Sequence, residues 1–213
     1  MGKVRAVCIS EKRGTQKKNI ESAVFVENWG IEGDAHAGNW HRQISLLSEE
    51  TIAAFKARGA EVTDGAFGEN LVVSGYDFTK FPVGTRFTCK DVVLELTQIG
   101  KECHHGCEIF QKMGECIMPT NGVFAKVLHG GKISVGDEFH VQYRAAVITL
   151  SDTASKGERE DASGAAVEEI VRKEGYEVVF KKIIPDDGDS LTALLCELSD
   201  EDKADLILPT GGT

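Results

Sequence analysis

The sequence lacks the features that mark membrane and secreted proteins. No stretch of its 213 residues approaches the roughly 20 consecutive apolar residues that a membrane-spanning helix needs. Residues 1–10 carry a charge inside every short apolar run, so they do not resemble a secretory signal peptide. Ala6 stands where N-myristoylation requires Ser or Thr. We therefore expect a cytoplasmic protein with no membrane partner, whose six cysteines are thiols, metal ligands or reactive groups rather than disulfides.

An excess of basic residues is also missing. Lys and Arg number 24 against 34 Asp and Glu, which gives a net charge of −10. General nucleic-acid binders derive their affinity from a basic face, so we expect no nucleic-acid partner. A small anionic ligand stays compatible with this charge, because it needs only a local cationic site. Internal repeats and low-complexity tracts are absent, and 41% hydrophobic residues are typical of a globular protein.

The charge is divided unevenly along the chain. Residues 1–143 hold 16 basic and 18 acidic side chains, whereas residues 144–213 hold 8 basic and 16 acidic ones. Five of the six cysteines lie in the first part, and only Cys196 lies in the second. This change of composition predicts two domains, 1–143 and 144–213.

The first part is predicted to be mainly β. Short β-rich runs separated by Gly, Asp and Asn turn residues occur at 22–26, 70–73, 86–89, 92–96 and 138–141. One helix is expected after Ser48, a favourable N-cap, with Ile52 and Phe55 on one face and Gly59 at its end. Many short strands at this spacing favour a β-barrel, which leaves few open sheet edges.

The second part alternates between strands and helices. Buried or strand-like runs occur at 145–150, 176–184 and 206–208. A helix is expected from about Ser163 to Gly175, and another follows Ser190 as its N-cap, with leucines at helical spacing from 191 to 198. This β-α-β-α-β order predicts an α/β domain with a parallel sheet.

The second part ends in a Gly-rich loop at 209–213. Such a loop after a parallel strand usually presents backbone N–H groups to an anion, together with the N-terminus of a following helix. No helix follows it within the 213 residues, and three strands leave a long sheet edge uncovered. We therefore expect an incomplete α/β domain, a piece of a longer one, whose sheet a second copy can complete in a homo-oligomer.

Several motifs of the first part occur together in a fixed order. They are Gly-Ile-Glu-Gly-Asp-Ala-His at 30–36, His-Arg-Gln-Ile-Ser-Leu-Leu-Ser at 41–48, Phe-Gly-Glu-Asn-Leu at 67–71, Thr-Gln-Ile-Gly-Lys-Glu-Cys at 97–103, and Gly-Gly-Lys-Ile-Ser-Val-Gly-Asp at 130–137. In this order they resemble the MOSC domain, the C-terminal module of molybdenum cofactor sulfurase, over residues from about 20 to 143. The resemblance implies a β-barrel whose recurrent cysteine, here Cys103, carries sulfur or contacts a molybdenum centre. It also makes His41, Arg42 and Asn70 candidates for binding the molybdenum cofactor.

Residues 144–213 resemble the first half of a molybdopterin adenylyltransferase domain. The match rests on the motifs at 148–152, 157–164, 184–187 and 208–213. In that family the Gly-rich loop and acidic groups hold the pterin phosphate and a metal-bound nucleotide, which implies molybdopterin, Mg²⁺ and nucleotide as ligands of the complete domain. The positions carried over are Ser151, Asp152, Asp161, Asp186, Thr210, Gly211 and Gly212. Because the family's loop continues with acidic residues beyond this last Thr, we do not expect this polypeptide to transfer adenylyl groups by itself.

Cys103 is also a candidate reactive residue by its neighbours in the sequence. A sulfur-carrying cysteine must ionise, and Lys101, His104 and His105 are cations that lower a thiol pKa. The alternative is a buried, unreactive thiol. If Cys103 carries a persulfide, Cys107 can resolve it by forming a disulfide and releasing sulfide.

The same segment offers a metal-binding alternative. Cys103, His104 and Cys107 are candidate ligands, with Cys116 as a further thiol, and this donor set suits Zn²⁺. Their C-x3-C-x8-C spacing differs from the paired C-x2-C spacing of structural zinc sites.

Together the two resemblances predict a protein of molybdenum cofactor metabolism. The expected partners are a cysteine desulfurase-type donor, which loads Cys103 with a persulfide, and a molybdoenzyme or cofactor as acceptor. Arg42 would help to hold an anionic group. Two alternatives stay open: a non-catalytic module that binds molybdopterin or molybdate, and a zinc-stabilised interaction domain.

Overall fold

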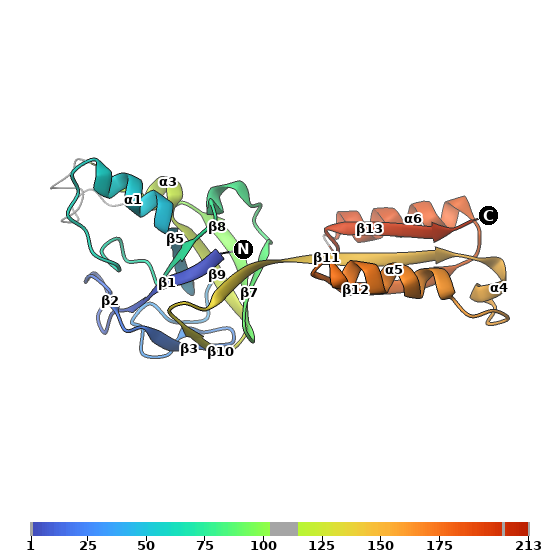
Figure 1. Cartoon of the computed structure of the whole chain (residues 1–213), viewed down its shortest axis with the longest axis horizontal. Helices are drawn as coiled ribbons and strands as arrows, with labels where there is room; N and C mark the ends of the chain where they lie inside the picture. The colour runs from blue at the N-terminus through green and yellow to red at the C-terminus, as the bar shows by residue number, and fades with distance from the viewer. Residues whose placement is uncertain (1, 103–114, 202, 213) are drawn as a thin grey trace. The chain divides into compact units, whose positions relative to one another are not determined.

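The computed structural model describes residues 2–102, 115–201 and 203–212 (Figure 1). The chain forms two compact units, Met1–Val141 and Gln142–Thr213. The sequence places this boundary between residues 143 and 144. Strand β11 (Glu138–Leu150) contributes its first residues to one unit and its remaining residues to the other. Each unit has a hydrophobic core of its own, so the two are described separately.

The first unit is mainly β, as the strand pattern predicts. Its strands are β1 (Gly2–Ile9), β2 (Lys18–Asn19), β3 (Ser22–Val26), β4 (Gly30–Ile31), β5 (Ile44–Ser48), β6 (Leu71–Ser74), β7 (Arg86–Cys89), β8 (Val92–Ile99), β9 (Val123–His129), β10 (Gly131–Ser134) and the start of β11. All five runs predicted from the sequence form strands, whereas β1, β2, β4, β5, β9 and β10 lie where we predicted none. The unit also contains α1 (Glu49–Ala57), the short 3-10 helix η1 (Phe78–Lys80) and α3 (Met118–Asn121).

The strands of this unit are hydrogen-bonded to one another in a continuous order. The order is β11, β7, β8, β9, β5, β6 and β1, and β1 pairs in turn with β11. The β5–β6 pair is parallel, while β1–β6, β5–β9, β7–β8 and β8–β9 are antiparallel. A separate antiparallel sheet has the order β10-β3-β4. The β-rich character is thus confirmed, and closure into a barrel stays a prediction.

Aromatic rings fill the core of the first unit. Phe78, Phe87 and Phe139 are each at most 1% exposed, and the centroid of Phe87 lies 5.4 Å from the centroids of the other two. Helix α1 packs on a second cluster through Ile52 and Phe55. Its N-cap is Ser48, as predicted, because the Ser48 side chain accepts a hydrogen bond from the N–H of Thr51.

The second unit is a three-stranded parallel sheet. Strand β11 lies between β12 (Tyr176–Ile184) and β13 (Leu206–Gly211), and both pairs are parallel, as predicted. Its helices are α4 (Asp152–Ser155), α5 (Ala162–Lys173) and α6 (Gly188–Asp200). Leu194 and Leu198 of α6 pack in one core with Ile148, whereas Gly164 of α5 lies against Thr149 on the other face of β11 (Figure 1).

The predicted starts of the two longer helices have different outcomes. Helix α5 begins at Ala162, within one residue of the predicted start near Ser163, and Asp161 is its N-cap. The prediction that Ser190 caps α6 is wrong, because Asp187 is the N-cap and its carboxylate accepts the backbone N–H of Ser190 at 2.8 Å. Ser190 therefore lies inside the first turn. No helix in the described part of the chain is long and apolar enough to cross a membrane.

Candidate functional site

A buried polar cluster lies where three of the motif segments of the first unit meet. At its centre is Asp34, whose side chain is completely buried. One carboxylate oxygen accepts the N–H of Ser10 at 3.0 Å. The other accepts hydrogen bonds from Nζ of Lys17 at 2.5 Å and Nδ2 of Asn70 at 3.0 Å. Asp34 therefore joins three segments that are far apart in the sequence.

Asn70 extends this cluster to two strands. Its Nδ2 also donates to the carbonyl of Cys8 in β1, at 3.0 Å. Its Oδ1 accepts hydrogen bonds from the N–H and the hydroxyl of Ser45 in β5, at 3.1 and 3.0 Å. The side-chain amide is thus engaged on both its nitrogen and its oxygen, and Asn70 holds β1, β5 and Asp34 together. Its predicted role in binding the cofactor stays a prediction.

The charges in this cluster shift the pKa of both ionised partners. Burial by itself would raise the pKa of Asp34, but hydrogen bonds from His36, Lys17 and Asn70 outweigh it and hold that pKa well below its ordinary value. Burial lowers the pKa of Lys17, against the opposing attraction of Asp34. Asp34 is therefore ionised, and Nζ of Lys17 beside it has little access to water, with 2% of the Lys17 side chain exposed.

A second buried carboxylate, that of Glu69, organises the adjacent loop. It accepts the N–H of Gly65 at 2.7 Å and the N–H of Phe67 at 3.0 Å. Burial raises its pKa to about 7 in spite of these hydrogen bonds. The loop also requires glycine at position 65, because φ is +85° there and a Cβ would lie 2.2 Å from the carbonyl oxygen of Lys17.

A cavity of about 760 Å³ opens beside this cluster. Lys17, His36, Arg42 and Lys101 line it, together with aromatic and small polar residues, and no Asp or Glu side chain is among its described lining residues. A cavity with cationic groups and no carboxylates attracts anions. Its size is that of a site for a small organic molecule.

Arg42 is held in the cavity by two aromatic rings. Its Cζ atom lies 4.9 Å from the ring centroid of Trp40 and 5.6 Å from that of Phe124. Within the described part of the chain its buried Nε has no hydrogen-bond partner. Arg42 thus lines the cavity, whereas His41 is absent from the cavity lining and shares a 3.0 Å hydrogen bond with Gln98. The predicted roles of both residues in binding the cofactor stay predictions.

The predicted sulfur-carrying residue, Cys103, lies outside the described residues, as do the predicted metal ligands His104 and Cys107. The described residues on either side of this segment include Lys101 and Cys116, and both line the cavity. Among residues 2–102, 115–201 and 203–212, no group of three or more His, Cys, Asp or Glu side chains is arranged to hold a metal ion.

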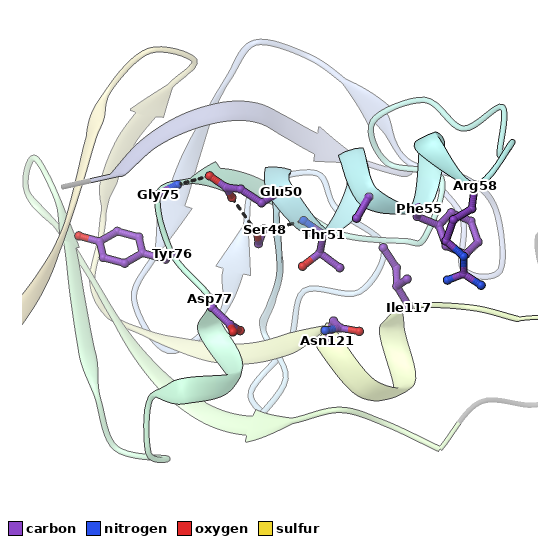
Figure 2. Close-up of a pocket in the computed structure, with 11 residues that line it drawn as sticks. Ser48, Glu50, Thr51, Phe55, Arg58, Gly75, Tyr76, Asp77, Ile117 and Asn121 are labelled. Atoms are coloured by element: carbon purple, nitrogen blue, oxygen red, sulfur yellow. Dashed lines mark hydrogen bonds between the residues drawn. The ribbon is translucent and has the colours of Figure 1, made fainter.

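A second cavity in this unit, of about 650 Å³, contains none of the predicted site residues (Figure 2). It lies beside α1, and Glu50 and Gly75 are among its lining residues. The two carboxylate oxygens of Glu50 accept the N–H of Gly75 at 2.7 Å and the hydroxyl of Ser48 at 2.8 Å. These polar groups are therefore already paired with one another.

The predicted residues of the second unit gather where the parallel strands end. The N–H of Ser151, after β11, donates to the carbonyl of Ile184 at the end of β12. The N–H of Asp186 donates to a carboxylate oxygen of Asp152 at 3.1 Å, and the N–H of Gly212 donates to the carbonyl of Leu150 at 3.2 Å. Ligands of open parallel sheets bind at this carboxyl edge.

Three other predicted residues have clear positions in this unit. Asp161 caps α5 by accepting the N–H of Gly164 at 2.8 Å, and it also accepts the hydroxyl of the buried Thr149 at 2.9 Å. Thr210 lies in β13 opposite Thr149. Gly211 has a φ of +94°, and a Cβ there would lie 2.2 Å from the carbonyl oxygen of Leu150, so only glycine fits. Ligand contacts by these residues stay predictions.

The family model described as MOSC domain matches residues 33–140, which is half of the chain. The chain belongs to the MOSC domain family. A second model, described as a probable molybdopterin binding domain, matches residues 146–213. The two matches give the protein a role related to the molybdenum cofactor, as both sequence resemblances predict.

Two curated relatives match the second unit. Over 71 residues this MOSC protein is 44% identical to the molybdopterin adenylyltransferase of Pyrococcus furiosus, covering 33% of this chain and 41% of that protein. Over 69 residues it is 36% identical to the molybdopterin adenylyltransferase of Helicobacter pylori strain 26695, covering 32% and 39%. The chain thus spans about 40% of the length of these relatives.

Two solved structures share the fold. The YuaD protein of Bacillus subtilis superimposes with a TM-score of 0.57 at 23% identity, over 66% of this chain and 96% of that one. YiiM of Geobacillus stearothermophilus superimposes with a TM-score of 0.52 at 16% identity, over 83% and 94%.

Sequence reasoning did not single out Lys17, Asp34, Glu69 or Trp40 as parts of the site. Asp34 and Glu69 lie inside the motifs at 30–36 and 67–71. The presence of a carboxylate in each motif is therefore the sequence signal that could have identified them as site residues. Nothing in the local sequence distinguishes Lys17 from the neighbouring surface lysine, Lys18.

Proposed function

We propose that the MOSC unit carries sulfur as a persulfide on Cys103 and presents it to a molybdenum–pterin centre held at the cationic cavity. The observation that supports this most is the cavity itself, which Arg42 and Lys101 line without any described carboxylate. Lys101, which lines this cavity, is two residues from Cys103 in the sequence. The series of strand pairs that returns from β1 to β11 supports a barrel as the frame of this site.

The loading step is an exchange between a thiolate and a persulfide. The Cys103 thiolate attacks the terminal sulfur of a persulfide on a cysteine desulfurase-type donor. A new S–S bond forms on Cys103, the donor's S–S bond breaks, and the donor cysteine leaves as a thiolate that takes up a proton. Lys101, His104 and His105, the neighbours of Cys103 in the sequence, would favour the thiolate form, because nearby positive charge lowers a thiol pKa.

Arg42 and Lys101 have the chemistry to hold the acceptor. A guanidinium binds phosphate or carboxylate through two parallel hydrogen bonds, and an ammonium adds a point charge. Molybdopterin supplies such a group through its phosphate. The mixture of cationic and aromatic lining residues therefore fits an anionic heterocycle.

For the second unit we propose molybdopterin binding at the carboxyl edge of its sheet. Gly211 and Gly212 both have positive φ, at +94° and +83°, and the backbone N–H groups of a loop in such a conformation can bind a phosphate. Asp152 and Asp186 supply the carboxylate oxygens that Mg²⁺ prefers when a nucleotide is also bound. Adenylyl transfer by this chain alone is not part of the proposal.

The proposal is tested by two assays on the parent protein and on Cys103→Ser. The first is equilibrium binding of molybdopterin, and the second is the sulfane sulfur formed after incubation with a cysteine desulfurase and cysteine. We expect the variant to retain binding and to lose the sulfane sulfur. Cys116→Ser is the matched control, because Cys116 lines the same cavity. Equal sulfane sulfur in parent and Cys103→Ser would contradict the proposal and favour a non-catalytic binding module.

The zinc-stabilised alternative is separated by metal analysis. We expect the purified chain to hold no stoichiometric zinc, since the proposal needs Cys103 as a reactive thiolate. One zinc per chain that is lost in Cys103→Ser and in Cys107→Ser would favour the interaction domain instead.

A further inference from the structure

We propose that Trp40 is a positioning residue which, together with Phe124, orients Arg42 as the oxyanion-binding group of the cavity. The inference rests on the proposed function, because it assigns the anionic part of that ligand to one side chain. Arg42 is the residue that binds, and Trp40 acts through it.

Two aromatic rings restrict the position of the Arg42 guanidinium. Its Cζ lies 4.9 Å from the Trp40 centroid and 5.6 Å from the Phe124 centroid, within the range of cation–π contacts. A guanidinium packed on aromatic faces keeps its N–H groups available at its edges, where a planar carboxylate or a phosphate can accept two of them. The two rings therefore restrict the movement of the guanidinium before a ligand arrives, which lowers the entropy lost on binding.

The two rings are held in different ways. Phe124 belongs to β9, is 7% exposed and packs in the core cluster beneath α1. Trp40 lies in the segment before β5 and is 36% exposed, and its Nε1 donates to the carbonyl of His36 at 3.1 Å. Trp40 is fixed but not part of the core, so its substitution perturbs Arg42 without removing a core side chain.

The charges around Arg42 point to an anionic ligand. The described residues provide no carboxylate in the cavity lining, and they provide no partner for the buried Nε of Arg42. Asp34, which lies close by, is engaged by Lys17 and Asn70. The class of ligand that fits is a phosphate monoester or a carboxylate, with Lys101 as a second cation on the cavity wall.

Binding is tested with inorganic phosphate and is followed by the fluorescence emission of Trp40. The chain has two tryptophans, so Trp29→Phe leaves Trp40 as the one indole emitter. We expect phosphate, at constant ionic strength, to change this emission in a saturable manner. Adding Arg42→Lys to this variant keeps the charge but removes the planar fork, and we expect it to weaken binding about fivefold.

Variants at position 40 separate orientation from charge, with phosphate binding measured by equilibrium dialysis. Trp40→Leu should weaken binding about fivefold, and Trp40→Phe should restore it to within about twofold, because a ring again faces the guanidinium. Thermal unfolding confirms that each variant is folded. Equal affinities of Trp40→Leu, Arg42→Lys and the parent would overturn the inference, and so would a parent that does not bind phosphate.

Sulfane sulfur on Cys103, measured on the same proteins, distinguishes this inference from the proposed function. A parent that loads sulfur but binds no phosphate overturns the role of Trp40 and Arg42 alone. Phosphate binding with the expected dependence on position 40, in a protein that takes up no sulfur, supports the inference and overturns the sulfur proposal.

Discussion

Nζ of Lys17 lies 2.5 Å from Oδ2 of Asp34, and the two side chains are 2% and 0% exposed. This buried ion pair joins the segment before β2 to the motif at 30–36, and Asn70 connects it to β1 and β5. Taking two charges out of water is expensive, so each of them depends on the other and on the surrounding hydrogen bonds. The pair fixes one wall of the cavity, because both Lys17 and Asn70 line it.

Removing one charge of this pair should destabilise the first unit strongly. Asp34→Asn leaves the buried Lys17 ammonium without its counter-charge, and we expect a loss of about 3–5 kcal/mol in the free energy of unfolding, measured with urea. The matched control is Glu49→Gln, which breaks an ion pair to Arg5 whose side chains are about half exposed. That control should lose less than about 1 kcal/mol. Similar losses in both variants would contradict the structural role given to Asp34.

Glu69 should give the protein a pH dependence of opposite sign to that of an ordinary paired carboxylate. Burial raises its pKa from 4.5 to about 7 in the folded state. Between these values the folded state keeps a proton that the unfolded state releases, so the free energy of unfolding falls as the pH rises. This loss of stability amounts to up to about 3 kcal/mol. It is complete near pH 7 and stays constant at higher pH.

Glu69→Gln removes this contribution. Urea unfolding between pH 4.5 and 7.5 should show the stability of the variant rising relative to that of the parent across the window, whatever the offset between them. Glu95→Gln is the control, because Glu95 is a carboxylate on β8 with 30% of its side chain exposed, and its profile should run parallel to that of the parent. Parallel profiles for Glu69→Gln would show that this carboxylate is ionised normally.

Two glycine substitutions test the packing of α5 on β11. In Gly164→Ala the new Cβ would lie 2.2 Å from a carboxylate oxygen of Asp161 and 2.3 Å from the hydroxyl of Thr149. We expect this to break the helix cap and cost about 1–2 kcal/mol, although alanine favours helices. Gly188→Ala, at the start of α6 with no atom near the added Cβ, should be neutral or stabilising by about 0.5 kcal/mol. Amide hydrogen exchange in the two helices is the measurement, and equal effects would contradict this packing.

The end of β13 offers a test of molybdopterin binding by the second unit. Gly211→Ala brings a Cβ to 2.2 Å from the carbonyl oxygen of Leu150, so the backbone of the loop must move. We expect about a tenfold loss in molybdopterin affinity, since precise placement of backbone N–H groups holds the phosphate. The binding is measured by equilibrium dialysis, with Gly188→Ala as the control that should bind as the parent does. Unchanged affinity in Gly211→Ala would place the ligand elsewhere.

Local signals in the sequence were sufficient for much of the fold. Ser48 as an N-cap, with Ile52 and Phe55 on one face, predicts α1, and the alternation of apolar strands and helices after residue 144 predicts the parallel sheet. The cap of α6 was misplaced because Asp187 and Ser190 both suit an N-cap by residue type. The carboxylate of Asp187 bonds the N–H of Ser190, and this contact decides between them.

The site was harder to predict, because its contacts join distant segments. Lys17, Asp34 and Asn70 meet only after the strands have paired, and a buried Glu69 has the same local sequence as an exposed one would have. The motifs did identify Arg42 and Asn70, which both reach the cavity. They did not identify Trp40, because its contact with Arg42 depends on the conformation of the segment before β5.

The most direct test of the central claim is intact-mass spectrometry after exposure to a cysteine desulfurase and cysteine, followed by peptide mapping. The account predicts that the parent gains one sulfur atom on the peptide that contains Cys103, and that Cys103→Ala gains none while remaining folded. Cys196→Ala, which changes the exposed thiol of the second unit, should gain sulfur as the parent does. A folded, reduced parent that gains no sulfur, or a Cys103→Ala variant that gains as much as the parent, would contradict sulfur carriage by this MOSC protein.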